Sequence, residues 1–550
     1  MFNKIEKVIL DKTGYSYQDL LDIEEKEYII QNIDKAVEII KTAIENAIPI
    51  TVVGDYDCDG ICASAIFKTT LTSLGINVKI RLPRRFSEGY GLSEKIIDEI
   101  DSGLVITVDN GIAAKQAIQK AKDKGLTVLV TDHHLAPADG VPDVADLIID
   151  PNAIPDSATF NGYCGAGLAL KICEKLTNNQ RVLNKISILG AIATVADSVP
   201  MLEDNRNIVK KGLHLLNEGL NVPLALQELI SIKDLINITE KDIGFAIGPC
   251  INAQGRLNDD GADTSLSFLT FVGNSEASEE VARNMLSCNE FRKTLTENAM
   301  AELNNQLIDD GALFDKVIVL QNSNVSEGLV GLCAGKLAEE QKKPTLVFGP
   351  FENGICKGSC RTVKGAHLKN ILDEVNSKIP HAIVKYGGHE MAAGISVYEE
   401  YFDEFKEVIN TVNFEIEDIS NVADIKITED EIPLAIAELK KFAPFGEGFP
   451  EVVFKVIDYV AAPTGGSHYT ILKEKHLKFL GNGTEALWFG ALEKYQDMEE
   501  PVKFDAIGTL SINYFNGKET PSIEIRDIVP KLATTNTSLQ DLLLRASEMR

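Results

Sequence analysis

Five short apolar runs, near residues 50, 78, 105, 128 and 147, alternate with segments of helical spacing. This alternation is typical of a parallel sheet whose strands are joined by crossover helices. In such a sheet, ligands bind beyond the carboxyl ends of the strands. We therefore expect an α/β domain whose functional groups lie along one edge of the sheet.

Acidic and imidazole side chains follow several of these runs. They are Asp55, Asp57 and Asp59 after the first run, Asp109 after the third, Asp132, His133 and His134 after the fourth, and Asp197 after a predicted helix over 186–196. Taken alone, Asp109 is more often a turn residue or a helix N-cap, and adjacent histidines are often surface residues. Their shared place at the expected sheet edge favours a common site.

The donor types indicate a site for hard divalent cations. Carboxylate oxygens with one or two imidazoles suit Mg²⁺ or Mn²⁺ better than they suit thiolate-binding metals. A calcium loop is excluded, because the twelfth position counted from Asp55 is Ile66 rather than Glu. The donors exceed the needs of one octahedral ion, which predicts two ions, roughly 3.5 to 4 Å apart, that share a bridging Asp. Hydrolysis of a phosphodiester or phosphoanhydride is the first functional expectation.

The order of the motifs adds a family resemblance. Gly-Asp-Tyr-Asp-Cys-Asp-Gly at 54–60, Thr-Val-Asp-Asn-Gly-Ile at 107–112, Thr-Asp-His-His at 131–134 and Thr-Val-Ala-Asp-Ser-Val-Pro at 194–200 resemble the motifs of the DHH phosphoesterase superfamily. Within it, the chain is most similar to the RecJ family of single-strand-specific 5′→3′ DNA exonucleases. Further similar segments lie at 83–91, 251–256, 358–361, 387–394 and 442–452. The resemblance covers most of the chain, from about residue 32 to the 520s.

The resemblance implies roles for the acidic and imidazole residues. The implied metal ligands are Asp57, Asp59, Asp109, His133 and Asp197, with Asp109 as the bridge and Asp55 either a direct ligand or the partner of a ligand water. Asp132 would fix the imidazole of His133. His134 would face the scissile phosphate and assist its oxyanion. The nucleophile would be a metal-bound hydroxide, and the cofactors two Mn²⁺ or Mg²⁺ ions.

The resemblance also implies a set of substrate-binding residues. They are Arg85, Asn252, Arg256, Ser359, Arg361, Gly387, Gly388 and His389. Ser359 and Arg361 are expected to form a pocket for a 5′-phosphate, because Gly358 lets backbone amides approach an anion. Gly387 and Gly388 are expected on a loop that brings His389 to substrate held between two domains.

The chain departs from the family pattern at three places. The usual Trp-His-Glu-Gly reads Val325-Ser326-Glu327-Gly328, the usual Gly-Pro-Arg reads Gly248-Pro249-Cys250, and the usual Gly-Ser-Gly-Arg-Ser reads Gly358-Ser359-Cys360-Arg361-Thr362. None of the three changes a proposed metal ligand. They bear instead on how the nucleic-acid strand is held.

A formal net charge of −28 argues against a nucleic-acid enzyme, since binding to polyphosphate normally rests on clustered Lys and Arg. Two local clusters answer part of this objection. Lys357, Arg361, Lys364 and Lys369 lie in an acid-free segment over 353–372, and Lys79, Arg81, Arg84 and Arg85 form a second group. Either cluster alone could be an ordinary solvated face. Within a narrow groove they could hold a strand.

Length and pattern predict several domains. We expect N-terminal helices over 1–48, a DHH phosphoesterase domain over 49–204, a helical connector over 205–311, a DHH-associated α/β domain over 312–414, and an OB-type nucleic-acid-binding β-barrel over 431–550. The run over 276–307 predicts a long connecting helix. Strands of the barrel are expected at 452–459, 469–472, 486–490, 505–510 and 523–528.

The compartment and partners follow from similar reasoning. The nine cysteines form no C-x-x-C pair, and no secretory or membrane segment is expected, so we expect a cytoplasmic protein with reduced thiols. The expected substrate is single-stranded DNA in repair and recombination. A monomer is expected, with a single-strand-binding protein and a helicase as partners.

Three functions compete at this point. The leading hypothesis is a metal-dependent 5′→3′ exonuclease specific for single-stranded DNA. The enzymatic alternative is a DHH-type phosphodiesterase for short oligonucleotides or cyclic dinucleotides, which would not need a C-terminal barrel. A non-catalytic nucleic-acid-binding relative would have lost metal ligands, and all five implied ligands are present.

Overall fold

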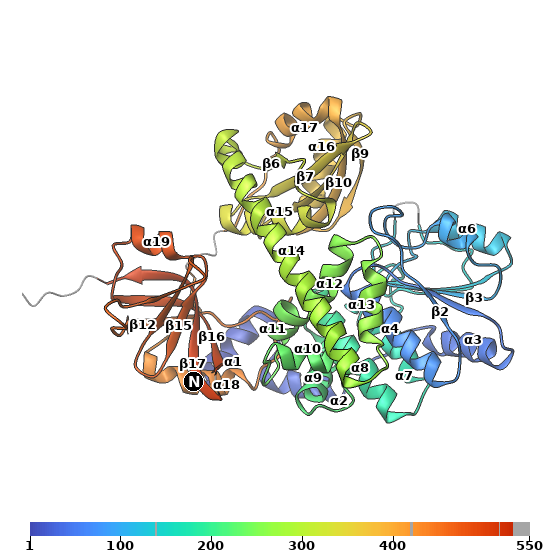
Figure 1. The fold of residues 1–550 in the computed structure, drawn as a ribbon, viewed down its shortest axis with the longest axis horizontal. Helices are drawn as coiled ribbons and strands as arrows, with labels where there is room; N and C mark the ends of the chain where they lie inside the picture. The colour runs from blue at the N-terminus through green and yellow to red at the C-terminus, as the bar shows by residue number, and fades with distance from the viewer. Residues whose placement is uncertain (138–139, 418–421, 516, 532–550) are drawn as a thin grey trace, which may run out of the picture. The chain divides into compact units, whose positions relative to one another are not determined.

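The computed structural model describes residues 1–137, 140–417, 422–515 and 517–531. It divides into two compact units, one made of Lys26–Glu417 and the other of Met1–Glu25 together with Asp418–Arg550 (Figure 1). The expected boundary after residue 48 differs from this division. Helices α1 (Phe2–Thr13) and α2 (Tyr17–Glu25) belong to the second unit, where the rings of Phe2 and Tyr17 each lie 5.4 Å from that of Phe442.

The larger unit begins with a five-stranded sheet in which every strand pair is parallel, as predicted. Its order is β2-β1-β3-β4-β5, and its strands are β1 (Ile50–Val53), β2 (Lys79–Arg81), β3 (Leu104–Val108), β4 (Thr127–Thr131) and β5 (Leu147–Ile149). The crossover helices include α4 (Cys58–Ser73), α5 (Glu94–Asp98) and α6 (Lys115–Asp123). The carboxyl ends of β1, β3 and β4 therefore lie side by side at one edge.

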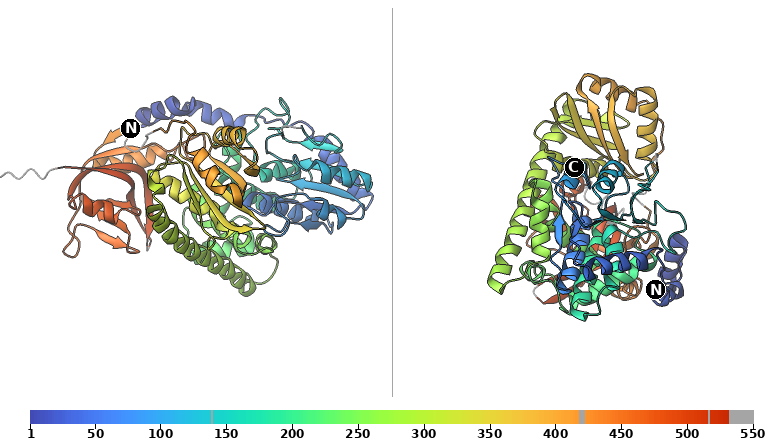
Figure 2. Two further views of the ribbon diagram at one scale, coloured as in Figure 1. Left: turned by 90° about the horizontal axis from the view of Figure 1, so that it is seen from above. Right: turned by 90° about the vertical axis from the view of Figure 1, so that its right-hand side faces the viewer.

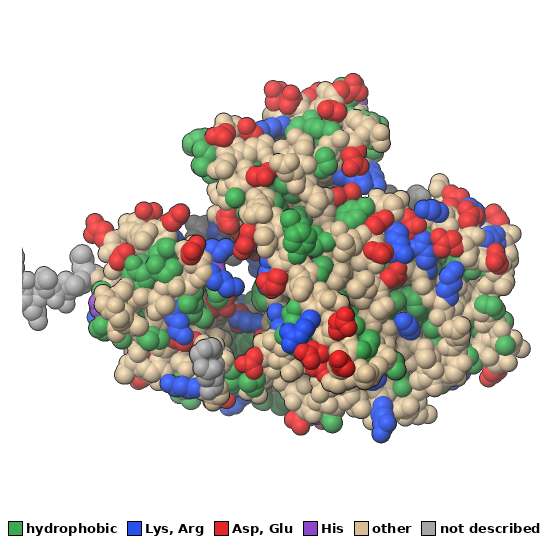
Figure 3. Space-filling model, viewed as in Figure 1, with side chains coloured by type: hydrophobic (Ala, Val, Ile, Leu, Met, Phe, Trp, Pro, Cys, Tyr) green, Lys and Arg blue, Asp and Glu red, His purple; other side chains and the backbone are tan. Residues whose placement is uncertain are grey.

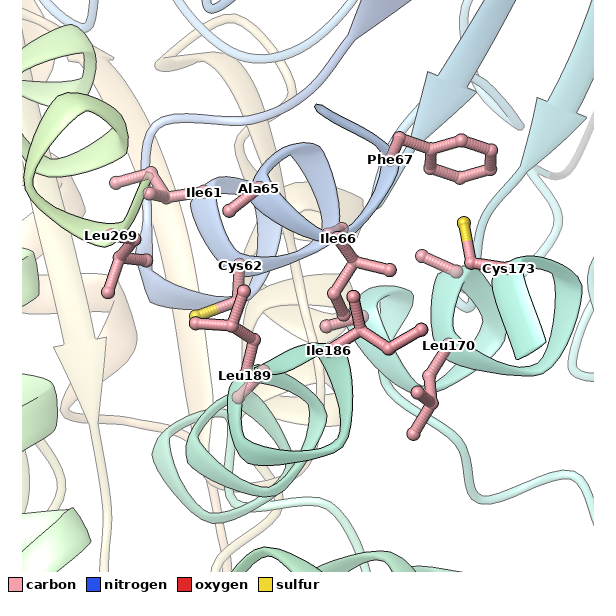
Figure 4. Close-up of a cluster of buried hydrophobic side chains, with 14 of the residues drawn as sticks. Ile61, Cys62, Ala65, Ile66, Phe67, Leu170, Cys173, Ile186, Leu189 and Leu269 are labelled. Carbon is pink, nitrogen blue, oxygen red and sulfur yellow. The ribbon is translucent and has the colours of Figure 1, made fainter. Parts of the chain in front are cut away.

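Helix α4 is buried along most of its length, which explains its many small and apolar residues. It packs against α7 (Gly165–Glu174) and α8 (Gln180–Ala196), while α3 (Ile33–Glu45) contributes its apolar face to the same core. Figure 4 shows side chains from α4, α7 and α8 meeting in this core, among them Ile66, Leu170 and Ile186. Dense packing around α4 fixes the position of the acidic loop from which it begins.

The segment that follows is helical, as predicted. It contains α9 (Glu203–Asn217), α10 (Leu224–Ile232), α11 (Glu240–Asp242), α12 (Gly248–Leu257), α13 (Gly261–Leu269) and α14 (Ser275–Asp309). The predicted long connecting helix is α14, which has 35 residues. Both views of Figure 2 show it as one continuous helix. Among the described residues, no helix combines the length and apolar character needed to cross a membrane.

A second, mixed sheet follows α14. Its order is β6-β7-β8-β10-β9, with β6 (Ile318–Gln321), β7 (Thr345–Glu352), β8 (Ile355–Arg361), β9 (Ile383–Gly388) and β10 (Ala392–Tyr398), accompanied by α15 (Glu327–Gln341), α16 (Leu368–Lys378) and α17 (Phe402–Ile409). The expectation that Gly387 and Gly388 lie on a loop was wrong. They end β9 and pair with Gly394 and Ala393, because the run from Ile383 continues its ladder to the turn.

The smaller unit contains the expected C-terminal β domain. Its seven-stranded sheet has the order β11-β12-β16-β17-β15-β14-β13, with β11 (Ile425–Ile427), β12 (Phe454–Val460), β13 (Thr470–Leu472), β14 (His476–Leu480), β15 (Glu485–Trp488), β16 (Lys503–Phe515) and β17 (Lys518–Pro530). Helices α18 (Ile432–Leu439) and α19 (Leu492–Asp497) complete it. Strands β11 and β14 were not predicted. The part of the expected domain beyond residue 531 lies outside the described residues.

Candidate metal centre and anion pocket

The acidic loop between β1 and α4 is held by its own backbone. Asp57 is the N-cap of α4, and its carboxylate accepts the N–H groups of Asp59 (3.0 Å) and Gly60 (3.2 Å). A Cβ at Gly60 would lie 2.5 Å from the backbone nitrogen of Asp55, so only glycine fits there. The side-chain oxygen of Asn252, a predicted substrate-binding residue, accepts the N–H of Cys58 (2.9 Å) and thereby supports this loop.

The N-terminus of α7 seats the third carboxylate of the loop. The backbone N–H groups of Gly165 (2.6 Å) and Ala166 (2.7 Å) donate to the two oxygens of Asp59. Helix N-termini favour negative charge, so the start of α7 is a favourable position for this buried carboxylate. Each oxygen retains a further lone pair for a cation.

Asp109 lies immediately after β3 in the left-handed backbone region, with φ 62°. A Cβ at Gly165 would approach the Cβ of Asp109 to 2.5 Å, so the start of α7 is packed directly against Asp109. The hydroxyl of Tyr90 donates to the carbonyl oxygen of Asp109 at 2.8 Å. These contacts fix the direction of the Asp109 carboxylate.

The predicted ligands converge at this edge of the sheet. Three overlapping groups have donor atoms within 4.8 Å of one another: Asp55, Asp57 and Asp109; Asp59, His133 and Asp197; and Asp109, His133 and His134. Nε2 of His133 lies 3.1 Å from Asp109, and 3.7 Å from both Asp59 and Asp197. Asp109 and His133 each belong to two of the groups, which is the arrangement expected of residues shared between two ions.

The electrostatics of the cluster are those of a site that needs a cation. Burial and the repulsion of neighbouring carboxylates raise the pKa of Asp55, Asp109 and Asp197 well above the ordinary value. Oδ1 of Asp55 is buried and has no hydrogen-bond partner among the described residues. Burial also lowers the pKa of His133, which leaves its imidazole neutral and available as a ligand.

The structure corrects the expected partner of Asp132. Its carboxylate bonds Nδ1 of His134 at 2.7 Å, whereas it contacts His133 only through the backbone N–H at 2.8 Å. The pair forms because alternate residues after β4 point to the same side, which places Asp132 with His134 and turns His133 toward the carboxylates. Burial opposes the charged imidazole, yet the hydrogen bond and charge of Asp132 raise the pKa of His134 to about 9.

Four arginines form a cationic group beside this cluster: Arg85, Arg256, Arg292 and Arg361. Burial and the neighbouring guanidinium groups lower the pKa of Arg256 to about 9. The guanidinium of Arg85 lies 4.5 Å from the ring of Tyr56 in the acidic loop. All four are partly buried, yet within the described part of the chain none of them pairs with a carboxylate, which indicates an anion site.

The other predicted basic residues are mostly paired. Arg81 binds Glu88 and Glu99, Arg84 binds Asp263, and Lys357 binds Glu327. On the face in Figure 3, acidic and basic side chains are interspersed over the domain of the first sheet. Of the arginines in the two expected basic clusters, only Arg85 and Arg361 have no carboxylate partner among the described residues.

The predicted 5′-phosphate residues are adjacent on β8. Nη1 of Arg361 donates to the hydroxyl of Ser359 at 2.7 Å, and a Cβ at Gly331 of α15 would lie 3.1 Å from both side chains. His389 follows β9 and is exposed. Partial desolvation of its ring and the positive charge of His134 lower the pKa of His389, so the two imidazoles are within electrostatic range of each other.

Sequence reasoning missed three residues that support this site. Tyr90 contacts Asp109, Arg292 joins the arginine group from α14, and the side-chain amide of Asn152 donates to the carbonyl oxygen of His133 at 2.6 Å. The signal for Asn152 was its place just after the fifth apolar run. Nothing in the sequence around Arg292 distinguishes it from other helical arginines.

Three separate parts of the chain match known protein families. Residues 49–195 match the model of the DHH family, N-terminal domain, residues 314–413 match the DHHA1 domain, and residues 423–527 match the RecJ OB domain. The single-stranded-DNA-specific exonuclease RecJ of Salmonella typhimurium is 32% identical over 77% of this chain and 78% of its own. That of Bacillus subtilis is 30% identical over 90% of this chain and 63% of its own.

The chain belongs to the RecJ family. Solved RecJ structures share its fold. RecJ from Thermus thermophilus in complex with Mn²⁺ aligns with a TM-score of 0.74 and 25% identity over 92% of this chain and 72% of that one. An exonuclease RecJ bound to manganese aligns with a TM-score of 0.58 and 27% identity over 69% of this chain and 94% of that one.

The departures from the RecJ pattern lie away from the metal cluster. Cys250 is buried in α12, where it packs beside Asn289 of α14, and Cys360 is buried in the second sheet. Ser326 is the exposed N-cap of α15, with no hydrogen bond from its side chain to the helix. Cys250 and Cys360 place buried thiols where the pattern has an arginine and a glycine. Ser326 places a shorter side chain at the surface where the pattern has a histidine.

Proposed function

We propose that this chain hydrolyses single-stranded DNA in the 5′→3′ direction, with two divalent ions, Mn²⁺ or Mg²⁺, as cofactors. The observation that carries this proposal is the convergence of carboxylates and one neutral imidazole from the ends of three strands and of α8, with Asp109 and His133 shared between groups. Membership of the RecJ family, whose relatives are named as exonucleases, supports the choice of substrate.

The residues fit the proposed ions. Asp57, Asp59, Asp109, His133 and Asp197 would hold them, and the orphan oxygen of Asp55 would take a direct or water-mediated place. Oxygen donors with one imidazole match Mn²⁺ and Mg²⁺. Bound ions would supply Lewis-acid polarisation of the phosphate and a hydroxide at neutral pH.

The protein's own contribution to the reaction lies in His134 and its partners. Asp132 keeps His134 protonated at neutral pH, so its imidazolium would stabilise charge that develops on the phosphate oxygens. The hydroxyl of Tyr90 lies 3.3 Å from Nδ1 of His134 and limits the rotation of that ring. His134 would therefore act by binding and orienting the substrate, and Tyr90 by holding the ring of His134 in place.

The arginine group supports the proposed 5′ polarity. Ser359, Arg361, Arg256 and Arg85 would bind the terminal 5′-phosphate through charge-assisted hydrogen bonds. Arg85 is also stacked on Tyr56 of the acidic loop, so the first linkages inward would reach the metal cluster. His389 and the close backbone at Gly387 and Gly388 would contact the strand from the second sheet.

Partners and compartment complete the proposal. The OB domain would bind the same single strand by base stacking and backbone contacts. We further propose that the protein is a monomer that acts in the cytoplasm in DNA repair and recombination, with a single-strand-binding protein and a helicase. Analytical ultracentrifugation and co-purification test these points separately from catalysis.

The direct experiment uses labelled single strands, duplexes and short dinucleotides with Mn²⁺. We expect mononucleotides to be released from the 5′ end of single strands, and Asp109→Asn to lower turnover by at least about a thousandfold while strand binding persists. Asn tolerates the left-handed backbone of this position, so the fold should survive. Preference for dinucleotides would favour the phosphodiesterase alternative, and release from the 3′ end would contradict the polarity.

A further inference from the structure

A cavity of about 910 Å³ lies beside the arginine group and is not used by the proposed reaction. It is bordered by α12, α14, the start of α15 and the turn between β7 and β8. Its lining includes Phe86, Arg256, Asn258, Phe291, Ser326 and Lys357. Ligand sites of this size hold molecules as large as a nucleotide.

The cavity is separate from the metal cluster but shares one residue with the phosphate pocket. None of its described lining residues is a proposed metal ligand. Asn252 and Gly255 of α12 face the acidic loop, whereas Gln254 and Asn258 line the cavity. Arg256 lies between these two sides of the helix and lines the cavity as well.

The first turns of α15 connect the cavity to the phosphate pocket. Ser326 and Glu327 line the cavity. A Cβ at Gly328 would lie 2.0 Å from the carbonyl oxygen of Arg256, and Nη1 of Arg256 donates to the carbonyl oxygen of Gly328. One turn later, Gly331 touches Arg361 and Ser359. Arg256 and the first turns of α15 are therefore shared between the cavity and the phosphate pocket, which makes the two sites immediate neighbours.

The walls of the cavity suit a nucleoside. Phe86 and Phe291 supply aromatic surface. The ring of Phe291 is 59% exposed, and no described aromatic ring lies against it, so its face is free to stack on a base. The segment that carries Phe86 is anchored, because Asp259 accepts the N–H of Phe86 at 2.8 Å and the hydroxyl of Ser87 at 2.6 Å. Gln254, Asn258 and Asn353 offer amide groups to a base or ribose.

We propose that this cavity accepts a nucleoside joined through a 5′–5′ pyrophosphate to the end of a DNA strand, so that the chain degrades capped as well as phosphorylated 5′ ends. The inference rests on the proposed exonuclease function. Water adds to the phosphorus of the first internucleotide linkage, and the bond from that phosphorus to the 3′ oxygen of the capped nucleoside breaks. The 3′ oxygen takes a proton and becomes a hydroxyl, while the remaining strand keeps the phosphate as its new 5′-phosphate. The pyrophosphate remains intact, and the released product is a dinucleoside pyrophosphate.

The test compares two oligodeoxynucleotides of one sequence, one with a 5′-phosphate and one with a 5′-adenosine cap joined through a pyrophosphate. With the full chain and Mn²⁺, we expect kcat/KM for the two strands to agree within about tenfold, with the capped mononucleotide as first product. Cleavage of only the phosphorylated strand would overturn the inference and leave the proposed function standing. Release of AMP before cleavage would also overturn it, because the cap would then be removed rather than held. Failure on both strands would instead contradict the proposed function.

Variants of the wall separate the cavity from the phosphate pocket. Phe291→Ala should lower kcat/KM on the capped strand by about five- to a hundredfold, the usual effect of losing one base-stacking ring. Activity on the phosphorylated strand should remain within about twofold. Phe245→Ala is the matched control, since Phe245 is 82% exposed and does not line the cavity. An equal loss on both strands from Phe291→Ala would overturn the inference.

A second variant fills the cavity instead of removing a wall. Ser326→Leu adds bulk at an exposed position that makes no side-chain cap, so folding should be unaffected. It should lower kcat/KM on the capped strand at least about fivefold and spare the phosphorylated one. Ser323→Leu, on the same loop but outside the cavity, is its control. If neither Ser326→Leu nor Phe291→Ala lowers kcat/KM on the capped strand, the cap does not bind in this cavity and the inference is overturned.

Discussion

At the scale of single residues, the pair of Asp132 and His134 sets an expected pH dependence. Because Asp132 raises the pKa of His134 to about 9, Asp132→Asn should lower that pKa toward or below the ordinary 6.5. The basic limb of kcat/KM should then move to lower pH, and activity at pH 8 should fall about tenfold or more. Full pH profiles of both proteins provide the measurement. An unchanged basic limb would show that the charge of His134 is not used.

The pair of Asp132 and His134 also makes the stability of the fold depend on pH in a predictable direction. A histidine whose folded-state pKa is raised stabilises the fold fully below pH 6.5, and that stabilisation disappears as pH rises through about 9. The native protein should therefore exceed Asp132→Asn in stability most clearly near pH 6. Thermal unfolding at several pH values provides an independent check on the assignment.

Arg361 gives a second prediction at this scale. Charge-assisted hydrogen bonds are worth roughly 1.5 to 3 kcal/mol, so Arg361→Ala should lower kcat/KM on 5′-phosphorylated strands by about ten- to a hundredfold. Strands with a 5′-hydroxyl should lose much less, since the group that Arg361 would bind is absent. Lys364→Ala is the control, because it removes a nearby exposed charge from the same segment. Equal losses on both strands would show that Arg361 acts on the backbone or on folding.

At the scale of elements, the close packing of α7 against β3 controls the metal cluster. Gly165→Ala would place a methyl group 2.5 Å from the Cβ of Asp109, and overpacking of this kind costs about 1 to 3 kcal/mol. We expect Mn²⁺ affinity to fall at least tenfold as Asp109 is displaced. Gly167→Ala is the matched control, because its new methyl group would meet nothing nearer than 3.4 Å. Calorimetric titration with Mn²⁺ and thermal unfolding measure the two effects, and equal behaviour of the variants would contradict the role of this contact.

The elements differ in how far the sequence predicts them. Four of the five parallel strands were predictable because each is a short, mainly apolar run between helical segments, whereas β2 (Lys79–Arg81) was marked only by the apolar residues around it. Strand β14 was missed because its half-buried His and Lys residues interrupt the apolar signal, and β11 because three residues carry little pattern. The ends of β1, β3 and β4 were sufficient to place every acid of the cluster except Asp197, which follows α8. Contacts between distant elements, such as Asn252 with Cys58 or Arg292 with the other arginines, depend on helix packing that no local pattern encodes.

At the scale of the whole molecule, the metal cluster links stability to pH. Burial and mutual repulsion raise the pKa of Asp55, Asp109 and Asp197 above 3.8, so the folded protein binds protons more tightly than the unfolded chain does. In the absence of metal, stability should therefore fall as pH rises above about 4. Mn²⁺ binds the ionised carboxylates, and its stabilising effect should increase with pH.

Thermal unfolding in chelator and in saturating Mn²⁺, between pH 5 and pH 8, measures this linkage. The difference in Tm between the two conditions should widen steadily across the range. Asp109→Asn is a suitable control, because it removes one of the repelling carboxylates and should flatten the curve recorded in chelator. A Tm in chelator that is constant or rises with pH would contradict the description of the cluster as mutually repelling acids.

The hydrogen bonds of Asn110 have a consequence for the chemical ageing of the protein. Asparagine followed by glycine is prone to deamidation, in which the next backbone nitrogen attacks the side-chain carbonyl. Asn110 precedes Gly111, yet it is buried, its amide donates to the carbonyl oxygens of Val53 and Val108, and its oxygen accepts the N–H of Leu92. A side chain held in this way cannot turn toward the attacking nitrogen. During storage, isoaspartate should therefore accumulate at the exposed pairs that begin with Asn161, Asn353 and Asn482, and the sheet edge beside the metal cluster should keep its native chemistry.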